Sequence, residues 1–176
     1  MNMVYPESFE QRVGFDRIRE QIVERCSINS SKEVIRGEQF SRSMRVVEER
    51  LALADEMRLV ISMEPGAVIG EQQELRPIVE KIAVEGSYLV EAECVALLGG
   101  LKAVSEIVEF IRSRREGSYP RLRALTENVS IFPELQRAIE RVIDDKGEVR
   151  SSASEELHSL RRAIREHEGQ VAKRLQ

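Results

Sequence analysis

The sequence predicts an all-α protein, a helical bundle with one long helix at its C-terminal end. Apolar residues recur at spacings of three and four over most of the 176 residues, which is the period of an amphipathic helix. Stretches that alternate apolar and polar residues and are rich in Val, Ile and aromatic residues are hard to find. Proline is scarce, with 5 in the chain, and several stand at expected helix boundaries.

The composition is typical of one soluble domain, with 41% hydrophobic and 33% charged residues. A chain of this length can bury roughly two thirds of the surface that its unfolded form exposes, so a sizeable core is expected. The net charge is -4, which excludes a domain that grips phosphates over a whole face. Any contact with nucleic acid must therefore be local.

The first two predicted helices lie in the N-terminal third of the chain. One spans about residues 15–26, and a short helical piece follows at 31–35. The apolar stripe of the first helix has four members: Phe15, Ile18, Ile22 and Cys26.

A longer helix is predicted over about residues 44–62. Its end is set by the sequence Glu-Pro-Gly at 64–66, because proline disfavours a helical residue before it and glycine frees the chain to turn. Its apolar stripe has five members: Val47, Leu51, Ala54, Leu59 and Ile61.

The middle of the chain contains an interrupted segment and then the strongest helical pattern. Gly70, Pro77 and Gly86 divide residues 67–88 and leave one short helix at about 77–83. Apolar residues then repeat from 90 to 111, which predicts a helix of about six turns. The basic run that ends it complements the negative end of a helix, which explains Arg112, Arg114 and Arg115 structurally.

Two short helices, at about 122–125 and 133–143, precede a turn with the sequence DDKGEV and a final helix. Ser152 and Glu155 have the S-x-x-E spacing of a capping box, which predicts that the final helix begins there. We expect its first two turns to dock on the body and the part beyond about Ile164 to project. The apolar residues form a narrow seam typical of a single packing partner: Ala153, Leu157, Leu160, Ile164, His167 and Val171.

The cysteines and the N-terminus indicate a reduced intracellular compartment. Cys26 and Cys94 lie far apart in sequence within apolar helical patterns, so buried thiols without a disulfide are expected. The N-terminus has no basic flank followed by an apolar run, and no stretch approaches the roughly 18 apolar residues of a membrane span. A cytoplasmic protein with no membrane partner is therefore expected.

The residues predict no catalytic, cofactor-binding or metal-binding site in this chain. The G-x-x-x-x-G-K-[ST] loop that cradles nucleotide phosphates is absent. His158 follows Glu155 in a single E-x-x-H, without the second copy and extra carboxylates of a di-metal bundle, and His167 on the seam is interpreted as a packed neutral histidine. Adjacent acids such as Asp144 and Asp145 point about 100° apart on a helix and do not face each other.

The last helix also carries candidate contacts to DNA phosphates. The alternative is a solvated, salt-paired face, since Glu155, Glu156, Glu166 and Glu168 offset the basic residues. The candidate DNA-contacting residues are Arg161, Arg162, Arg165, Lys173 and Arg174.

The stretch GEVRSSASEELHSLRR, residues 147–162, resembles a segment of the MutS family, closest to the second bacterial MutS paralogue. Segments at 5–22 and 76–89 and the stretches YPRLRAL and IFPELQRAIERVIDDKG are similar to that paralogue in the same order. The motif is carried here by Gly147, Ser152, Ala153, Ser154, Glu155 and Leu157. The sequence departs from the family at Ser151, where Asp is common, and at Glu155, where Pro is common.

The resemblance implies a helical core domain at 1–150 and the start of a lever helix at 151–176 that leads to a DNA clamp. It implies that the chain is an N-terminal structural module of a DNA-binding ATPase in DNA repair or recombination. Such a protein suppresses homologous recombination and binds branched or mismatched DNA. It further implies ATP and Mg as cofactors of the parent protein, an endonuclease activity and a homodimer.

Two alternatives stay open at this point. The first is an all-helical interaction domain that dimerises through the seam beginning at Leu157, with no ATPase attached. The second is the action on stalled ribosomes that is associated with the same family. A gene that continues into a longer helix and then a phosphate-binding loop favours the MutS-like ATPase over the dimerising domain.

Overall fold

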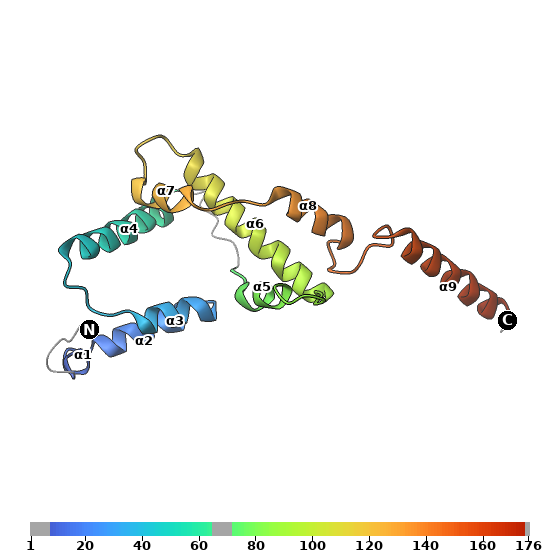
Figure 1. Ribbon diagram of the computed structural model, residues 1–176, viewed down its shortest axis with the longest axis horizontal. Helices are drawn as coiled ribbons and strands as arrows, with labels where there is room; N and C mark the ends of the chain where they lie inside the picture. Colours follow the sequence, from blue (N-terminus) through green and yellow to red (C-terminus); the bar gives the residue numbers. More distant parts are fainter. Residues whose placement is uncertain (1–7, 65–71, 175–176) are drawn as a thin grey trace.

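The computed structural model describes residues 8–64 and 72–174, with the side chains of 172–174 excluded, and it confirms the all-α class (Figure 1). In this part of the chain the structure has no strand, and one isolated antiparallel bridge joins Ile143 to Val149. The helices are α1 (Phe9–Arg12), α2 (Phe15–Arg25), α3 (Asn29–Gly37), α4 (Met44–Met63), α5 (Arg76–Ile82), α6 (Glu91–Ser113), α7 (Pro120–Glu127), α8 (Pro133–Val142) and α9 (Glu155–Arg174).

The helices form an open arrangement in which α6 is the central element (Figure 1). The principal packed pairs are α6 with α7, α6 with α8, α4 with α7, α2 with α3 and α1 with α2. Helix α9 extends away from the other helices, beyond the end of α8. None of the helices in the described part combines the length and the apolar character that crossing a bilayer requires.

The expectation of a sizeable core is wrong. The chain exposes 13927 Å², whereas a compact monomeric protein of its mass of 20.1 kDa exposes about 8,700 Å². The buried hydrophobic side chains in the described residues are few: Val23, Val60, Ile78, Leu97, Val108, Ile111 and Ile143. Helices that pack in pairs leave most of their apolar faces in contact with solvent.

The stripes predicted as core on the first long helices are partly exposed. On α2, Ile18 and Ile22 are 51% and 44% exposed, and Val23 on a different face is buried instead. On α4, Leu51 and Ile61 lie in solvent. Periodicity marks which residues share a face, but the neighbouring elements decide whether that face is covered.

Charged side chains position the short helices α3 and α5 and the start of α6. A Glu74 carboxylate oxygen accepts a hydrogen bond from the Ser30 N–H at 2.8 Å, at the start of α3, and this bond lowers the pKa of Glu74. Glu93 of α6 accepts from the Lys81 ammonium of α5 at 2.6 Å and from the Val90 N–H at 2.9 Å, and these bonds lower the pKa of Glu93. These contacts set the position of helices that bury little apolar area.

Helix α6 contains two adjacent glycines that differ in their surroundings. Gly100 is buried against Leu75, and a Cβ at Gly100 would lie 2.6 Å from Leu75 Cδ1. At Gly99 a Cβ would meet nothing nearer than Gln73 Cγ at 3.8 Å. Gly100 therefore allows the segment before α5 to approach the backbone of α6.

Both cysteines are free and half-buried rather than fully buried. The Cys26 thiol, just after the end of α2, lies 3.4 Å from the carbonyl oxygen of Ile22 in the last turn of that helix. Burial raises the pKa of the Cys94 thiol, and Glu91 and Glu93 raise it further.

Candidate functional site

The connection between α8 and α9, residues 143–154, is a closely hydrogen-bonded joint. Its first part is a tight turn closed by Asp144, whose Oδ1 accepts hydrogen bonds from the backbone N–H groups of Lys146 at 2.9 Å and Glu148 at 3.0 Å. The two N–H groups, that of Glu148 first, hold the pKa of Asp144 below its usual value. Gly147 has a φ of 82°, a left-handed conformation that suits glycine.

Arg150 attaches the joint to the end of α8. Its Nε donates to the carbonyl oxygens of Glu140 at 2.9 Å and Ile143 at 3.0 Å, and its backbone N–H donates to Val142 at 2.7 Å. Carbonyls at a helix C-terminus have no partners within the helix, so a guanidinium there satisfies them and complements the helix dipole. Ile143 is 4% exposed and anchors the same segment in the apolar core.

Arg161 attaches α9 to the same joint. Its Nη1 donates to the Val149 carbonyl oxygen at 2.8 Å and to the Ser151 hydroxyl at 3.0 Å. Arg150, within the joint, thus binds the end of α8, and Arg161 of α9 binds the joint, so that the two arginines link α8 to α9.

The cap of α9 differs from the predicted box. The helix begins at Glu155, and the Ser154 hydroxyl oxygen accepts a hydrogen bond from the Leu157 N–H at 3.1 Å. Ser152 lies in the preceding turn, so the Ser152 and Glu155 box is corrected to an N-cap at Ser154. The turn held by Asp144 and Arg150 places Ser154, and not Ser152, at the first free N–H groups.

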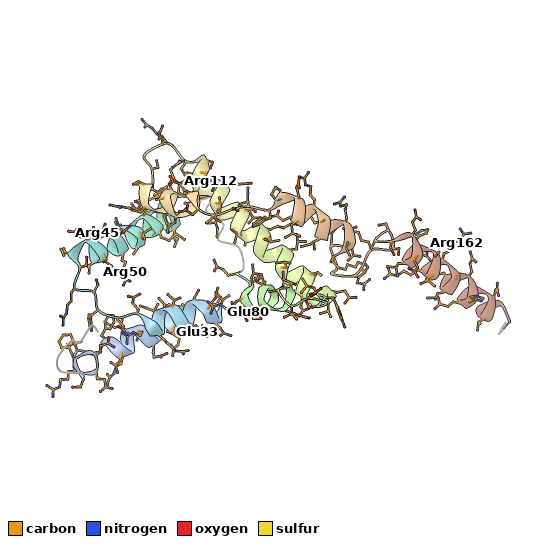
Figure 2. All side chains as sticks on the ribbon, viewed as in Figure 1. Glu33, Arg45, Arg50, Glu80, Arg112 and Arg162 are labelled. Atoms are coloured by element: carbon orange, nitrogen blue, oxygen red, sulfur yellow. The ribbon has the colours of Figure 1, made fainter. Side chains whose placement is uncertain are left out.

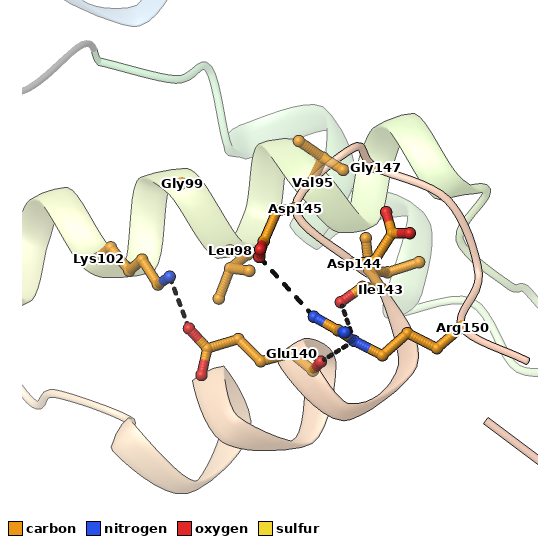
Figure 3. Close-up of a pocket in the computed structure, with 10 residues that line it drawn as sticks. All are labelled: Val95, Leu98, Gly99, Lys102, Glu140, Ile143, Asp144, Asp145, Gly147 and Arg150. Carbon is orange, nitrogen blue, oxygen red and sulfur yellow. Dashed lines mark hydrogen bonds and ion pairs between the residues drawn. The ribbon is translucent and has the colours of Figure 1, made fainter. Parts of the chain in front are cut away.

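A groove of about 540 Å³ lies between α6, α8 and the turn of the joint (Figure 3). Val95 and Leu98 of α6 and Ile143 give it an apolar floor, and the Lys102 ammonium pairs with the Glu140 carboxylate at 2.6 Å on one side. Gly147 lies against α6, since a Cβ there would be 3.2 Å from Val95 Cγ2. The close contact between Gly147 and Val95 fixes the turn of the joint relative to the central helix α6.

The predicted seam of α9 lies mostly in solvent. Leu160, Ile164 and Val171 are 55–57% exposed, while Leu157 and Ala153 are half-buried. The expectation that the first two turns of α9 dock on the body is therefore wrong, because Leu160 is exposed and Arg161 bonds to the joint instead. His167 is exposed rather than packed, and among the described residues α9 extends away from the other helices (Figure 1).

The candidate DNA-contacting residues are only partly brought together. Arg161 is used within the joint, and Arg162 pairs with Glu166 one turn later at 2.9 Å. Arg165 is exposed, and the side chains of Lys173 and Arg174 lie outside the described residues. Sequence reasoning did not identify Arg150 as a site residue, although a basic residue just after a turn that ends a helix is a recognisable signal.

The structure offers no catalytic centre of the usual metal type within the described residues, where no group of three or more His, Cys, Asp or Glu side chains could hold an ion. The contacts of the joint suit a mechanical role, in which it holds one helix in place relative to another. It holds the root of a long helix at a defined angle through charged donors and backbone acceptors, with little apolar burial.

No protein-family model matches the chain. Curated relatives do match, among them the endonuclease MutS2 of Geobacillus sp. (strain WCH70), 29% identical over 164 residues. The putative endonuclease MutS2 of Bacillus subtilis (strain 168) is 28% identical over 164 residues. Each alignment covers 92% of this chain and 21% of the relative.

The endonuclease MutS2 of Pelotomaculum thermopropionicum is 27% identical over 166 residues, with 94% of this chain and 21% of the relative covered. The alignments therefore include the joint and most of the helical body, and the chain spans about a fifth of the length of these relatives. The chain is therefore similar to the MutS2 endonucleases over most of its own length, as the resemblance at residues 147–162 predicts.

Proposed function

We propose that this chain is the body-and-lever module of a MutS-like protein that acts on DNA. In this proposal residues 1–150 form the body and residues 151–176 form the root of a lever helix. The module couples ATP hydrolysis elsewhere in the parent protein, with Mg as the metal cofactor, to a clamp that holds branched or mismatched DNA. The parent protein acts as a homodimer in the cytoplasm and suppresses homologous recombination.

The joint is the observation that supports this function. Arg150 binds the last carbonyls of α8, and Arg161 binds Val149 and Ser151 from within α9. A rotation of the body thus reaches α9 through short hydrogen bonds from charged donors, which are the stronger class of protein hydrogen bond. A lever needs a stiff root of this kind, whereas a tethered interaction helix does not.

The test compares two neighbouring arginines in the full product of the native gene. Arg161→Ala removes the bonds between α9 and the joint, while Arg162→Ala removes only an exposed pair with Glu166. Arg161→Ala should leave basal ATP hydrolysis unchanged and reduce its stimulation by branched DNA about fivefold or more, the range of a typical coupling energy. Arg162→Ala should retain the stimulation.

Two outcomes contradict the proposal. If the full native gene product hydrolyses no ATP, there is no ATPase for the lever to couple to the clamp, and the proposal fails. Equal stimulation in the two variants shows that the joint does not transmit the motion, even in a protein that binds DNA and hydrolyses ATP.

The exposed seam of α9 supports a second candidate, an all-helical domain that dimerises without an attached ATPase. Leu160 and Ile164 are each 55% exposed and could be covered by a second copy. Leu160→Lys with Ile164→Lys separates the candidates, because it should abolish self-association in sedimentation experiments if this candidate holds. Under the lever proposal the isolated chain stays monomeric with or without these changes.

A further inference from the structure

The corner where α6 ends and α7 begins is the most basic stretch of the chain. Within residues 112–127 five arginines stand against two glutamates, in a protein whose net charge is -4. Arg112 lies at this corner, and Arg162 lies at the far end of the molecule on α9 (Figure 2). The five arginines are Arg112, Arg114, Arg115, Arg121 and Arg123.

Two of these arginines hold the corner together by capping each other's helices. Arg112 of α6 donates to the carbonyl oxygens of Thr126 and Val129 at the end of α7, the second at 3.1 Å. Arg123 of α7 donates to the carbonyl oxygen of Arg114 at 2.6 Å and to that of Arg112 at 3.4 Å. The two guanidinium groups are therefore fixed in place in the same corner.

Helix α4 and the tip of the loop fix the rest of the corner. Arg114 pairs with Glu64 at 3.0 Å, and the Tyr119 hydroxyl donates to the same carboxylate at 3.0 Å. Tyr119 has a φ of 52°, a left-handed conformation that is uncommon for a side chain of its size. A Glu56 carboxylate oxygen accepts from the backbone N–H of Leu122 at 2.9 Å, which positions the start of α7.

Among the five arginines, Arg114 is the one whose side chain pairs with a carboxylate in the described structure. Arg112 and Arg123 bind neutral carbonyls, and a helix C-terminus offsets only about half a charge. The Nε of Arg123 is buried without a hydrogen-bond partner among the described residues. Arg115 and Arg121 are exposed, and in the described structure neither side chain has a carboxylate partner.

The basic residues of α9 differ in this respect. Arg161 is occupied within the joint and Arg162 is paired with Glu166. A polyanion would have to displace these contacts on α9. At the corner, Arg115 and Arg121 have no carboxylate partner among the described residues to displace, and Arg112 and Arg123 bind only neutral carbonyl oxygens. The guanidinium group suits phosphate geometry, so the exposed Arg115 and Arg121 can bind phosphates directly, while the fixed Arg112 and Arg123 add positive charge beside them.

We propose that the α6–α7 corner is a contact surface for the phosphate backbone of double-stranded DNA, with Arg115 and Arg121 as the direct contacts. The proposal rests on the DNA role proposed above and adds a second place at which the body meets DNA, away from the lever. Contacts to the backbone carry no sequence information, so the corner positions the protein on a duplex rather than reading bases.

The test measures binding of the 176-residue chain to a labelled duplex by fluorescence anisotropy over a range of low salt concentrations. The variant Arg115→Glu with Arg121→Glu is compared with Arg17→Glu with Arg25→Glu, which changes the net charge equally on exposed positions of α2. The corner variant should bind at least about tenfold more weakly and lose about two from the slope of log K against log salt. The control should retain most of the affinity and the slope.

Circular dichroism of both variants verifies folding, and the exposed positions make a loss of structure unexpected. Equal weakening in the two variants, or no binding of the duplex at low salt, overturns the assignment of the corner. A corner-dependent loss for duplex RNA alone overturns the choice of DNA. The lever function is judged separately by the Arg161 experiment, so failure of one does not imply failure of the other.

Discussion

The Nη1 atom of Arg161 lies 2.8 Å from the carbonyl oxygen of Val149, so a side chain in the second turn of α9 is bonded to the backbone that leads into that helix. The bond joins residues twelve positions apart in the sequence and closes a loop around the N-cap at Ser154. A helix held in this way keeps its direction although its apolar seam is exposed.

Arg161→Ala should free the direction of α9 in this chain. The change removes two hydrogen bonds from a charged donor, each worth about 1.5–3 kcal/mol. Spin labels at exposed Glu134 of α8 and Gly169 of α9, with Cys26 and Cys94 replaced by Ser, should report a broader distance distribution. Arg162→Ala serves as the control and should give the narrow distribution of the parent chain; a narrow distribution for Arg161→Ala would contradict the role of the joint.

Ser151→Asp should strengthen the same joint. It replaces a hydroxyl acceptor 3.0 Å from Arg161 with a carboxylate. The gain in unfolding free energy should be about 0.5–1 kcal/mol in urea melts. Arg161 lowers the pKa of the new carboxylate, so the gain is present above about pH 4 and disappears as the pH falls through the lowered pKa.

A matched control for Ser151→Asp is Ser152→Asp. Ser152 lies in the turn and makes no side-chain contact with Arg161 in the described structure. An equal gain in both variants would mean that general charge near the start of α9 is responsible, and not the contact with Arg161.

Gly99→Ala and Gly100→Ala should change stability in opposite directions. Alanine at exposed Gly99 meets nothing closer than 3.8 Å and should stabilise α6 by about 0.5–1 kcal/mol. Alanine at buried Gly100 forces Leu75 away from α6 and should cost about 1–3 kcal/mol. Urea melts of the two variants under the same conditions measure both signs, and a stabilising Gly100→Ala would show that the close approach of Leu75 contributes nothing.

Asp144 should make the fold sensitive to acid. Its folded pKa is below the unfolded value because the Glu148 and Lys146 N–H groups bond to the charged form, so its contribution is present above the unfolded pKa. That contribution is lost as the pH falls from about 4 through the lowered folded pKa. Asp144→Asn should therefore reduce the loss of stability between about pH 5 and pH 2, measured by urea melts at each pH.

Asp145→Asn is the control for that series, since the Asp145 side chain is fully exposed and its pair with Arg150 at 3.8 Å is screened by solvent. It should leave the pH dependence of stability as it is in the parent chain. Identical curves for Asp144→Asn and the parent chain would mean that the turn does not depend on the ionised carboxylate.

The sequence predicted the helices well because their signals are local. The helices expected at 15–26, 44–62 and 133–143 correspond to α2, α4 and α8 within one or two residues at each end. Three kinds of signal extend over only a few residues and can be recognised in the sequence. They are the spacing of apolar residues, the prolines at helix starts and the Glu-Pro-Gly sequence after Met63. The short helix α1 was missed, because four residues do not establish a period.

The tertiary structure decided which faces are covered and which charged residues are free. Glu74 and Ser30 lie 44 positions apart and Glu56 and Leu122 lie 66 apart, so no local pattern could predict these caps. The same reason explains the shift of the α9 cap from Ser152 to Ser154 and the use of Arg161 inside the joint. The sequence by itself determined where helices form, because helix formation depends on neighbours along the chain. Only the three-dimensional arrangement determined that the stripe of α2 and the seam of α9 face solvent, since burial requires a partner that the period of a helix does not specify.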